Sequence, residues 1–249
     1  MRIVHPALET VSHRPWPLPV GPWIMAQSWH DLLFMHWPLP AASVRAHVPA
    51  QLEIDQWNDE AWLAVVPFWM SGVRGRGMPA IRGLSRFPEL NVRTYVRHHG
   101  RPGVYFFSLD AASLPAVSVA RAWYHLPYFH AHMSATAEGD KVVYSSTRVR
   151  GEAEFRGSYG AVRPVELRRP GTIEHWLTER YCLFTEHRGR VCAGEIHHAP
   201  WPLQDASAEV ERNTMAVAAG LRLPDTAPLL HFARRLDVVI WPIRRSGRV

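Results

Sequence analysis

Residues 89–96, ELNVRTYV, alternate between two kinds of side chain with a period of two. This period is typical of a β-strand whose two faces differ. Leu90, Val92, Thr94 and Val96 share one face, whereas the other face carries Glu89, Asn91, Arg93 and Tyr95. One face of this predicted strand is therefore loaded with polar groups.

A second strand is predicted directly after the first. Residues 99–103, HGRPG, have the composition of a tight turn, and residues 104–110, VYFFSLD, alternate again. The two segments predict a hairpin. In the second strand, strict alternation places Val104, Phe106, Ser108 and Asp110 opposite Tyr105, Phe107 and Leu109.

The remaining patterns predict more strands than helices. Strands are expected at 28–38, 60–70, 129–135, 142–150, 152–162, 182–187, 190–198 and 231–243, and helices at 40–49, 113–126, 171–181 and 205–221. Residues 71–86 are rich in glycine and predict a long loop at the rim of the fold. No internal repeat is visible.

The composition indicates one globular domain. A chain of 249 residues with 47% hydrophobic side chains can bury a full core. Residues 1–22 contain five prolines and predict an extended arm lying on the body, so the domain is expected at 23–249. Its oligomeric state, including a homo-oligomer, is left open by the sequence.

Charge and cysteine usage exclude several classes of protein. The net charge is +6, but the arginines are scattered rather than clustered, which argues against a nucleic-acid surface. Cys182 and Cys192 do not face each other across the predicted turn at 187–190, so no disulfide is expected. With no signal peptide and no apolar run of about 18 residues, a cytoplasmic protein without membrane contact is predicted.

Several sequence strings in a fixed order resemble a known family. They are HDLLFMHWPLP, LEIDQWNDEAWLAVVPFWM, ELNVRTYV, PGVYFFSLDA, ARAWYHLPY, TERYCLF and HAPWPL, and together they run from about Trp29 to Leu203. They resemble the YqjF-like domain of unknown function in the acetoacetate decarboxylase-like superfamily. The resemblance implies an α+β fold, with a mainly antiparallel curved sheet forming a cone or barrel, a few peripheral helices and an internal ligand pocket.

Lysine usage limits what this resemblance implies about chemistry. Acetoacetate decarboxylase, an established example of lysine activation, forms a Schiff base between a lysine and its substrate. In the segment of this chain that resembles the lysine-bearing one, Tyr128 and Phe129 stand where the lysines would be. The single lysine of the chain, Lys141, lies in a predicted turn, where lysines are normally solvated. Schiff-base decarboxylation is therefore not expected.

The polar residues of the hairpin and the following helix are candidates for an internal site. A barrel interior would bring Glu89, Arg93, Arg121 and Tyr128 together, and arginine suits the recognition of carboxylates. We expect a pocket for a small anionic or carbonyl-bearing organic molecule. Its predicted catalytic residues are Arg121 as anion clamp, Glu89 as proton carrier and Tyr128 as donor, and its predicted ligand-binding residues are Arg93, Asp110, Tyr124 and His125.

Three alternatives remain open at this point. Glu89, Arg93, Asp110 and Arg121 could instead form a paired ion network that closes the barrel, because buried charges are usually paired. His125, His130 and His132 could form a metal site for a lyase or hydrolase. A non-catalytic binding or interaction protein, with a barrel filled by its own side chains, is the third. Whether the protein is an enzyme is left open, and no metal or cofactor is predicted.

Overall fold

The computed structural model describes residues 5–246, except for the side chains of residues 119, 120, 122 and 123 in one helix. Residues 1–4 of the predicted arm lie outside the described part. The strands are β1 (Met25–Leu39), β2 (Glu53–Ile54), β3 (Ala61–Gly75), β4 (Phe87–His98), β5 (Arg101–Ala111), β6 (Tyr128–Glu138), β7 (Lys141–Arg148), β8 (Glu154–Ala161), β9 (Cys182–His187), β10 (Arg190–His198), β11 (Gln204–Asn213), β12 (Leu229–Ile240) and β13 (Arg244–Arg245). The helices are α1 (Ala41–Arg45), α2 (Leu114–Tyr124), α3 (Ile173–Thr178), α4 (Met215–Ala218) and the 3-10 helix η1 (Pro6–Leu8).

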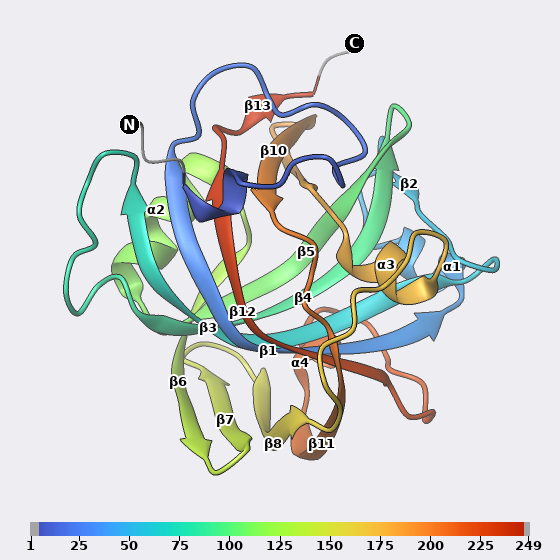
Figure 1. The fold of residues 1–249 in the computed structure, drawn as a ribbon. Coiled ribbons are helices and arrows are strands. Elements are labelled where there is room, and N and C mark those ends of the chain that lie inside the picture. The colour runs from blue at the N-terminus through green and yellow to red at the C-terminus, as the bar shows by residue number, and fades with distance from the viewer. Residues whose placement is uncertain (1–4, 247–249) are drawn as a thin grey trace.

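The described strands form one mixed sheet that curls into a ring rather than a regular barrel (Figure 1). The ring runs through β5, β4, β3, β1, β12, β10 and β9, and it is closed by pairing of β9 with β5. Within residues 5–246, β5 pairs in parallel with β6 and β9, and the other paired strands are antiparallel. The predicted α+β fold with a mainly antiparallel curved sheet is confirmed.

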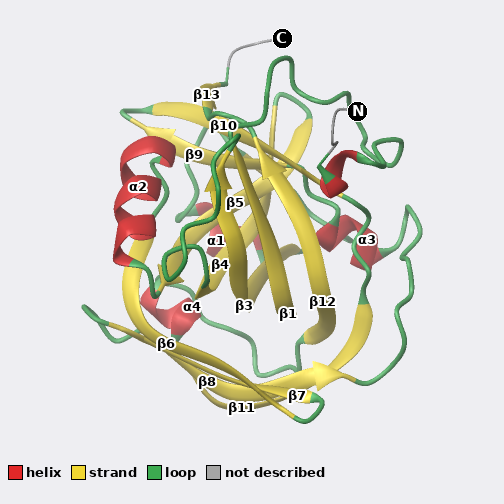
Figure 2. Cartoon of the chain, turned by 60° about the vertical axis from the view of Figure 1, so that its left-hand side comes forward, coloured by secondary structure: helices red, strands yellow, loops and turns green. Residues whose placement is uncertain are grey.

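A second layer covers one side of the ring. Strands β6, β7, β8 and β11 lie beneath the ring strands, and the helices lie at the periphery (Figure 2). The largest apolar core lies between the two layers and includes Leu90 and Val92 of β4 together with Tyr144 of β7 and Phe155 of β8. The second layer therefore covers one face of the ring strands. The side chains on the opposite, inner face surround a separate space.

Helix α2 follows from local signals. The side chain of Ser113 caps its N-terminus by accepting a hydrogen bond from the amide of Ala116, and Pro115 occupies the first turn. His125 ends the helix in the left-handed conformation, with φ of +52°, and Pro127 prevents continuation. The helix predicted at 113–126 is confirmed, and it positions Tyr124 against the ring.

The predicted hairpin is present as β4 and β5, but its second strand contains a β-bulge. Val92 pairs with Ser108 whereas Arg93 pairs with Phe106, which leaves Phe107 as an extra residue. Each extra residue exchanges the two faces of the strand. The prediction that Asp110 shares a face with Val104 and Phe106 is therefore wrong, because Asp110 pairs with Leu90 on the opposite face.

Two other predictions of local structure are wrong. Residues 205–221, predicted as one helix, form strand β11 and the short helix α4. The run contains alanine and glutamate, which favour helices, but pairing of β11 with β8 outweighs this preference. The predicted loop at 71–86 begins later than expected, since β3 continues to Gly75 by pairing with β1.

The predictions for the cysteines are confirmed. Cys192 lies opposite Thr185 and Cys182 opposite Glu195, and both thiols are free. The segment before β1 is held against β10, where Glu195 accepts hydrogen bonds from Arg14 Nη2 at 2.5 Å and from Trp16 Nε1 at 2.8 Å.

Candidate functional site

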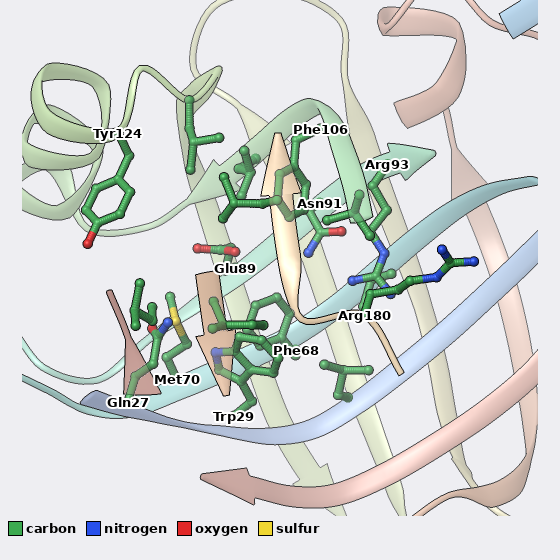
Figure 3. Close-up of a pocket in the computed structure, with 18 of the residues that line it drawn as sticks. Gln27, Trp29, Phe68, Met70, Glu89, Asn91, Arg93, Phe106, Tyr124 and Arg180 are labelled. Carbon is green, nitrogen blue, oxygen red and sulfur yellow. The ribbon is translucent and has the colours of Figure 1, made fainter. Parts of the chain in front are cut away.

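A cavity of about 200 Å³ lies inside the ring. Its walls come from the strands of the ring, β1, β3, β4, β5, β9, β10 and β12, and from Tyr128 at the start of β6, and α2 contributes Ala116 and Tyr124. Most of the lining is apolar or aromatic, with Trp29, Phe68 and Phe106 among its larger side chains (Figure 3). An apolar cavity with a few polar groups is the usual form of a site for a small organic molecule.

The polar groups of the cavity lie mainly along one strand. Glu89, Asn91 and Arg93 follow each other at every second position of β4 and line the cavity in this order (Figure 3). The two-residue period of a strand accounts for this arrangement, because Leu90 and Val92 point to the opposite core. The alternation predicted from residues 89–96 is confirmed.

Glu89 is buried beside a tyrosine. Its side chain is 4% exposed, and its Oε2 accepts a hydrogen bond from the hydroxyl of Tyr128 at 2.8 Å. Burial raises the pKa of Glu89, the hydrogen bond from Tyr128 partly opposes this rise and Asp110 adds a smaller increase, so that the pKa lies at about 8. Glu89 is therefore largely protonated at neutral pH.

Two tyrosines provide hydroxyl groups near this carboxyl. Burial raises the pKa of Tyr124 to about 12, and its hydroxyl has no hydrogen-bond partner among the described residues. Burial and the neighbouring Glu89 raise the pKa of Tyr128 well above its usual value. Both phenols therefore stay protonated and can donate hydrogen bonds.

Arg93 lies at the other end of the polar row. It is 8% exposed and forms no ion pair with any residue that the structure describes, and its Nε has no hydrogen-bond partner there. Its guanidinium carbon lies 5.3 Å from the centre of the Phe34 ring and 5.9 Å from that of Tyr95. Aromatic faces offset part of the cost of burying a cation, but a carboxylate partner is missing.

Arg180 lines the same end of the cavity (Figure 3). Its guanidinium carbon lies 5.0 Å from the centre of the Tyr95 ring, so both arginines contact this tyrosine. Its Nη1 pairs with Asp55 Oδ2 at 2.6 Å and its Nε donates to the carbonyl of Trp176, whereas its Nη2 has no partner among the described residues. Burial lowers the pKa of Arg180, and Asp55 opposes this. Arg180 is thus fixed in place with its Nη2 amino group unused.

Further buried polar atoms on the cavity wall lack hydrogen-bond partners in the described part of the chain. They are Trp29 Nε1, Asn91 Oδ1, His198 Nε2 and Trp201 Nε1. Buried polar groups without partners are rare in proteins and often indicate a site that water or a ligand completes. The lining therefore has unused donors and acceptors in an otherwise apolar chamber.

Comparison with known proteins places the chain in a family. Residues 26–237 match the model of the domain of unknown function DUF2071, described as an uncharacterised conserved protein. The chain belongs to this family. It is 45% identical to the uncharacterised protein YqjF of Bacillus subtilis over 238 residues, which cover 95% of this chain and 98% of that protein.

Solved structures similar to this DUF2071 chain have the acetoacetate decarboxylase-like fold. An acetoacetate decarboxylase matches with a TM-score of 0.61 and 14% identity, covering 92% of this chain and 90% of that one. An acetoacetate decarboxylase-like enzyme from Sphingomonas wittichii matches with 0.62 and 13%, covering 96% and 99%. The enduracididine biosynthesis enzyme MppR, solved with pyruvate, matches with 0.61 and 10%, covering 91% of each chain. At these identities the likeness shows the fold alone.

The lysine chemistry of acetoacetate decarboxylase has no counterpart in the cavity of this DUF2071 chain. The single lysine, Lys141, lies on β7, where Nζ pairs with Glu209 Oε1 at 2.7 Å and the side chain is 49% exposed. It does not line the cavity. The position that resembles the lysine-bearing step carries Tyr128, which is hydrogen-bonded to Glu89.

The structure brings together four of the seven predicted site residues. Glu89, Arg93, Tyr124 and Tyr128 all line the cavity. Arg121, Asp110 and His125 do not.

The expectation that Arg121 converges with Glu89 and Arg93 is wrong. The Arg121 side chain is exposed, and its Nε donates to the backbone carbonyl of Tyr128 at 2.6 Å. A guanidinium at the surface stays hydrated, whereas inside the ring it would need a second buried partner. The arginines at the cavity are Arg93 and Arg180 instead.

Asp110 is placed outside the cavity by the bulge at Phe107. Its carboxylate is fully buried and forms a bidentate ion pair with Arg148, at 3.0 Å from Nε to Oδ2 and 2.7 Å from Nη2 to Oδ1. A paired ion network is therefore present, but its arginine is Arg148 of β7 rather than Arg93 or Arg121. This ion pair links β7 of the second layer to β5 of the ring.

The three histidines of the metal hypothesis are not brought together. His125 stacks on His187, with ring centres 3.7 Å apart, and the rings of His130 and His132 are 5.9 Å apart. Across the described residues, no group of three or more histidine, cysteine, aspartate or glutamate side chains has a geometry that could hold a metal ion. The metal-dependent alternative therefore has no support.

Sequence reasoning did not select Arg180, Asp55 or His198 for this site. Arg180 lies in the string TERYCLF, and a lone arginine next to an apolar strand could have indicated a buried cation. Its partner Asp55 is 125 residues away in sequence, so no local pattern connects them.

In the part of the chain that the structure covers, no helix is long and apolar enough to cross a membrane.

Proposed function

We propose that this protein binds a small organic anion inside the ring, with Arg93 as the anion clamp. Glu89, which Tyr128 orients, then donates its proton to a carbonyl oxygen of the bound molecule, either as a hydrogen bond or by transfer. The observation that carries the proposal is the cation of Arg93, which lines an apolar cavity without an ion-pair partner among the described residues. A buried charge without a partner is costly, and a bound carboxylate would supply the partner.

The charges around the cavity favour an anion. Glu89 is largely neutral at pH 7, because its pKa is raised to about 8, so it does not neutralise Arg93. The charge of Arg180 is offset by Asp55, and Asp55 also pairs with Arg97 at 2.7 Å. The interior therefore carries a positive excess where an apolar wall strengthens electrostatic attraction.

Proton transfer is supported by the carboxyl and phenol pair. An acid with a pKa near the working pH is well suited to donate and recover a proton. Glu89 meets this condition, and the hydroxyl of Tyr128 orients it through a hydrogen bond. Because the cavity has no lysine, any reaction there would proceed without a Schiff base.

The structural neighbours support the class of ligand, not its identity. One of them, the enzyme MppR, is described as complexed with pyruvate, which is a carboxylate with a carbonyl group. Pyruvate has the two kinds of group that this cavity would recognise, a carboxylate for Arg93 and a carbonyl oxygen for the Glu89–Tyr128 pair. We therefore propose oxo acids and related carboxylates as the ligands of this chain.

Thermal-shift titration with benzoate and benzamide tests the proposal. The two molecules have similar shape, but only benzoate carries a charge. Benzoate should raise the melting temperature in proportion to its concentration, and benzamide should do so much less. Arg93→Met should weaken benzoate binding about 10- to 100-fold, the loss expected for one hydrogen-bonded charge of about 1.5–3 kcal/mol.

Arg121→Met is the matched control, because it removes an exposed guanidinium outside the cavity. It should leave the response to benzoate unchanged. Equal responses to benzoate and benzamide, or loss of the response in Arg121→Met with retention in Arg93→Met, would overturn the proposal.

A further inference from the structure

We infer that the ligand carries its anionic group and its proton-accepting oxygen at opposite ends of a flat apolar body, rather than on adjacent carbons. This inference deepens the proposed function and rests on it. It concerns the spacing of the ligand's two polar groups, which the positions of Glu89 and Arg93 determine.

The first observation is the separation of the two groups along β4. Glu89 and Arg93 are four residues apart on one strand and line the same cavity. At roughly 3.3 Å per residue their Cα atoms lie about 13 Å apart. Asn91 lies between them, and Figure 3 shows the three in a row with Arg180 at the Arg93 end and Tyr124 at the Glu89 end. The polar groups therefore form two separate ends.

The second observation is that each end has its own set of contacts. Glu89 is held by Tyr128, and the buried Asp110 acts on its pKa. Arg93 and Arg180 lie against the ring of Tyr95. Glu89 and Arg93 form no salt bridge, so the two ends do not neutralise each other. A 2-oxo acid, whose carbonyl is bonded directly to its carboxylate, is too short to contact both ends.

The third observation is an aromatic wall at the Glu89 end, where Phe68 of β3 lies directly opposite Glu89. Trp29 packs edge-on against Phe68, with ring centres 5.8 Å apart, and stacks on Trp201 at the same distance. Both Trp29 and Phe68 line the cavity (Figure 3). A dry apolar cavity of about 150 Å³ is known to bind benzene. A cavity of about 200 Å³ therefore has room for a substituted ring.

The geometry thus favours an aromatic carboxylate with a carbonyl group across the ring. Its carboxylate would bind Arg93, with the unused Nη2 amino group of Arg180 as a second donor. Its ring would lie against Trp29 and Phe68, and its carbonyl oxygen would accept the proton of Glu89.

Two isomers test this spacing directly. In 4-acetylbenzoate the ketone and the carboxylate lie across the ring, and in 2-acetylbenzoate they lie on adjacent carbons. Both have the same composition and charge. Isothermal titration calorimetry at pH 7 should show at least tenfold tighter binding of 4-acetylbenzoate to the full-length protein. Glu89→Met should reduce the affinity for 4-acetylbenzoate more than that for benzoate, because only the former has an oxygen at this end.

The outcomes separate the two proposals. If benzoate and 4-acetylbenzoate bind but 2-acetylbenzoate or pyruvate binds as tightly or more tightly, the inferred spacing is wrong and the proposed function stands. If no carboxylate binds, or if Arg93→Met binds all of them as wild type does, the proposed function fails and this inference fails with it.

Discussion

The hydroxyl of Tyr128 donates a hydrogen bond of 2.8 Å to Oε2 of Glu89 inside the ring. The two residues come from different parts of the fold. Glu89 belongs to β4 of the ring, and Tyr128 begins β6, the strand that leads into the second layer. From that layer, the hydroxyl of Tyr144 also donates to the backbone carbonyl of Glu89 at 2.8 Å. The second layer therefore positions the one titratable carboxyl that lines the cavity in the described part of the chain.

Glu89 should make stability depend on pH. Its pKa is 4.5 when exposed and about 8 in the folded protein, so the folded state holds a proton that the unfolded state releases. The contribution to stability is fully present below pH 4.5 and is lost as the pH rises through 8. Between pH 6 and pH 9 this loss should be about 2–3 kcal/mol. Urea unfolding of wild type and Glu89→Gln, followed by tryptophan fluorescence, measures it.

Glu89→Gln should lack this loss, because glutamine resembles the protonated acid and still accepts the hydrogen bond from Tyr128. Glu209→Gln is the control, since Glu209 is an exposed glutamate. Parallel pH profiles for wild type and Glu89→Gln would show that Glu89 is ionised at neutral pH.

Tyr128→Phe should shift this pH dependence. The hydrogen bond from Tyr128 lowers the pKa of Glu89, although burial outweighs it. Without the hydroxyl, the pKa of Glu89 should rise above 8, and the loss of stability should begin at a higher pH. A pH series of urea unfolding checks the direction. A midpoint at lower pH would mean that Tyr128 does not stabilise the ionised carboxyl.

Breaking the ion pair of Arg148 and Asp110 should destabilise the protein strongly. Arg148→Met leaves a fully buried carboxylate without its partner, which typically costs about 3–5 kcal/mol. The double variant Asp110→Asn with Arg148→Met should recover part of this loss. Arg156→Met, which breaks an exposed pair with Glu154, should cost less than about 1 kcal/mol. Urea unfolding at pH 7 compares the three, and equal losses for Arg148→Met and Arg156→Met would contradict the role of Asp110 as a structural anchor.

Arg93→Met should stabilise the ligand-free protein. The native side chain holds a buried charge without an ion-pair partner in the described residues, and an apolar side chain of similar length removes that cost. We expect a gain of about 1–3 kcal/mol in the free energy of unfolding, measured by urea at pH 7 without added carboxylate. A site that trades stability for binding behaves in this way. A loss of several kcal/mol would indicate that Arg93 has a structural partner instead.

The sequence predicted the polar face of β4 because a strand has a simple period. Glu89, Asn91 and Arg93 follow it without interruption. The next strand did not follow it, since the bulge at Phe107 moved Asp110 to the opposite face. A bulge adds one residue without a distinctive local signal, so alternation alone could not reveal it.

Long-range contacts account for the other differences. Strand β11 was predicted as part of a helix, because its residues favour a helix and only pairing with β8 makes it a strand. Arg121 was predicted inside the ring from its place among apolar neighbours, but its side chain satisfies a backbone carbonyl at the surface. The position of Arg180 depends on Asp55, which lies far away in sequence. The sequence thus indicated an arginine clamp but not which arginines form it.

A crystal structure of the protein with 4-bromobenzoate would test the central claim most directly, because the anomalous signal of bromine fixes the orientation of the ligand. We predict that the carboxylate lies within hydrogen-bond distance of the Arg93 guanidinium, with the bromine toward Glu89. A carboxylate bound at Arg121 on the surface, or a ligand in the cavity whose carboxylate points away from Arg93, would contradict the account.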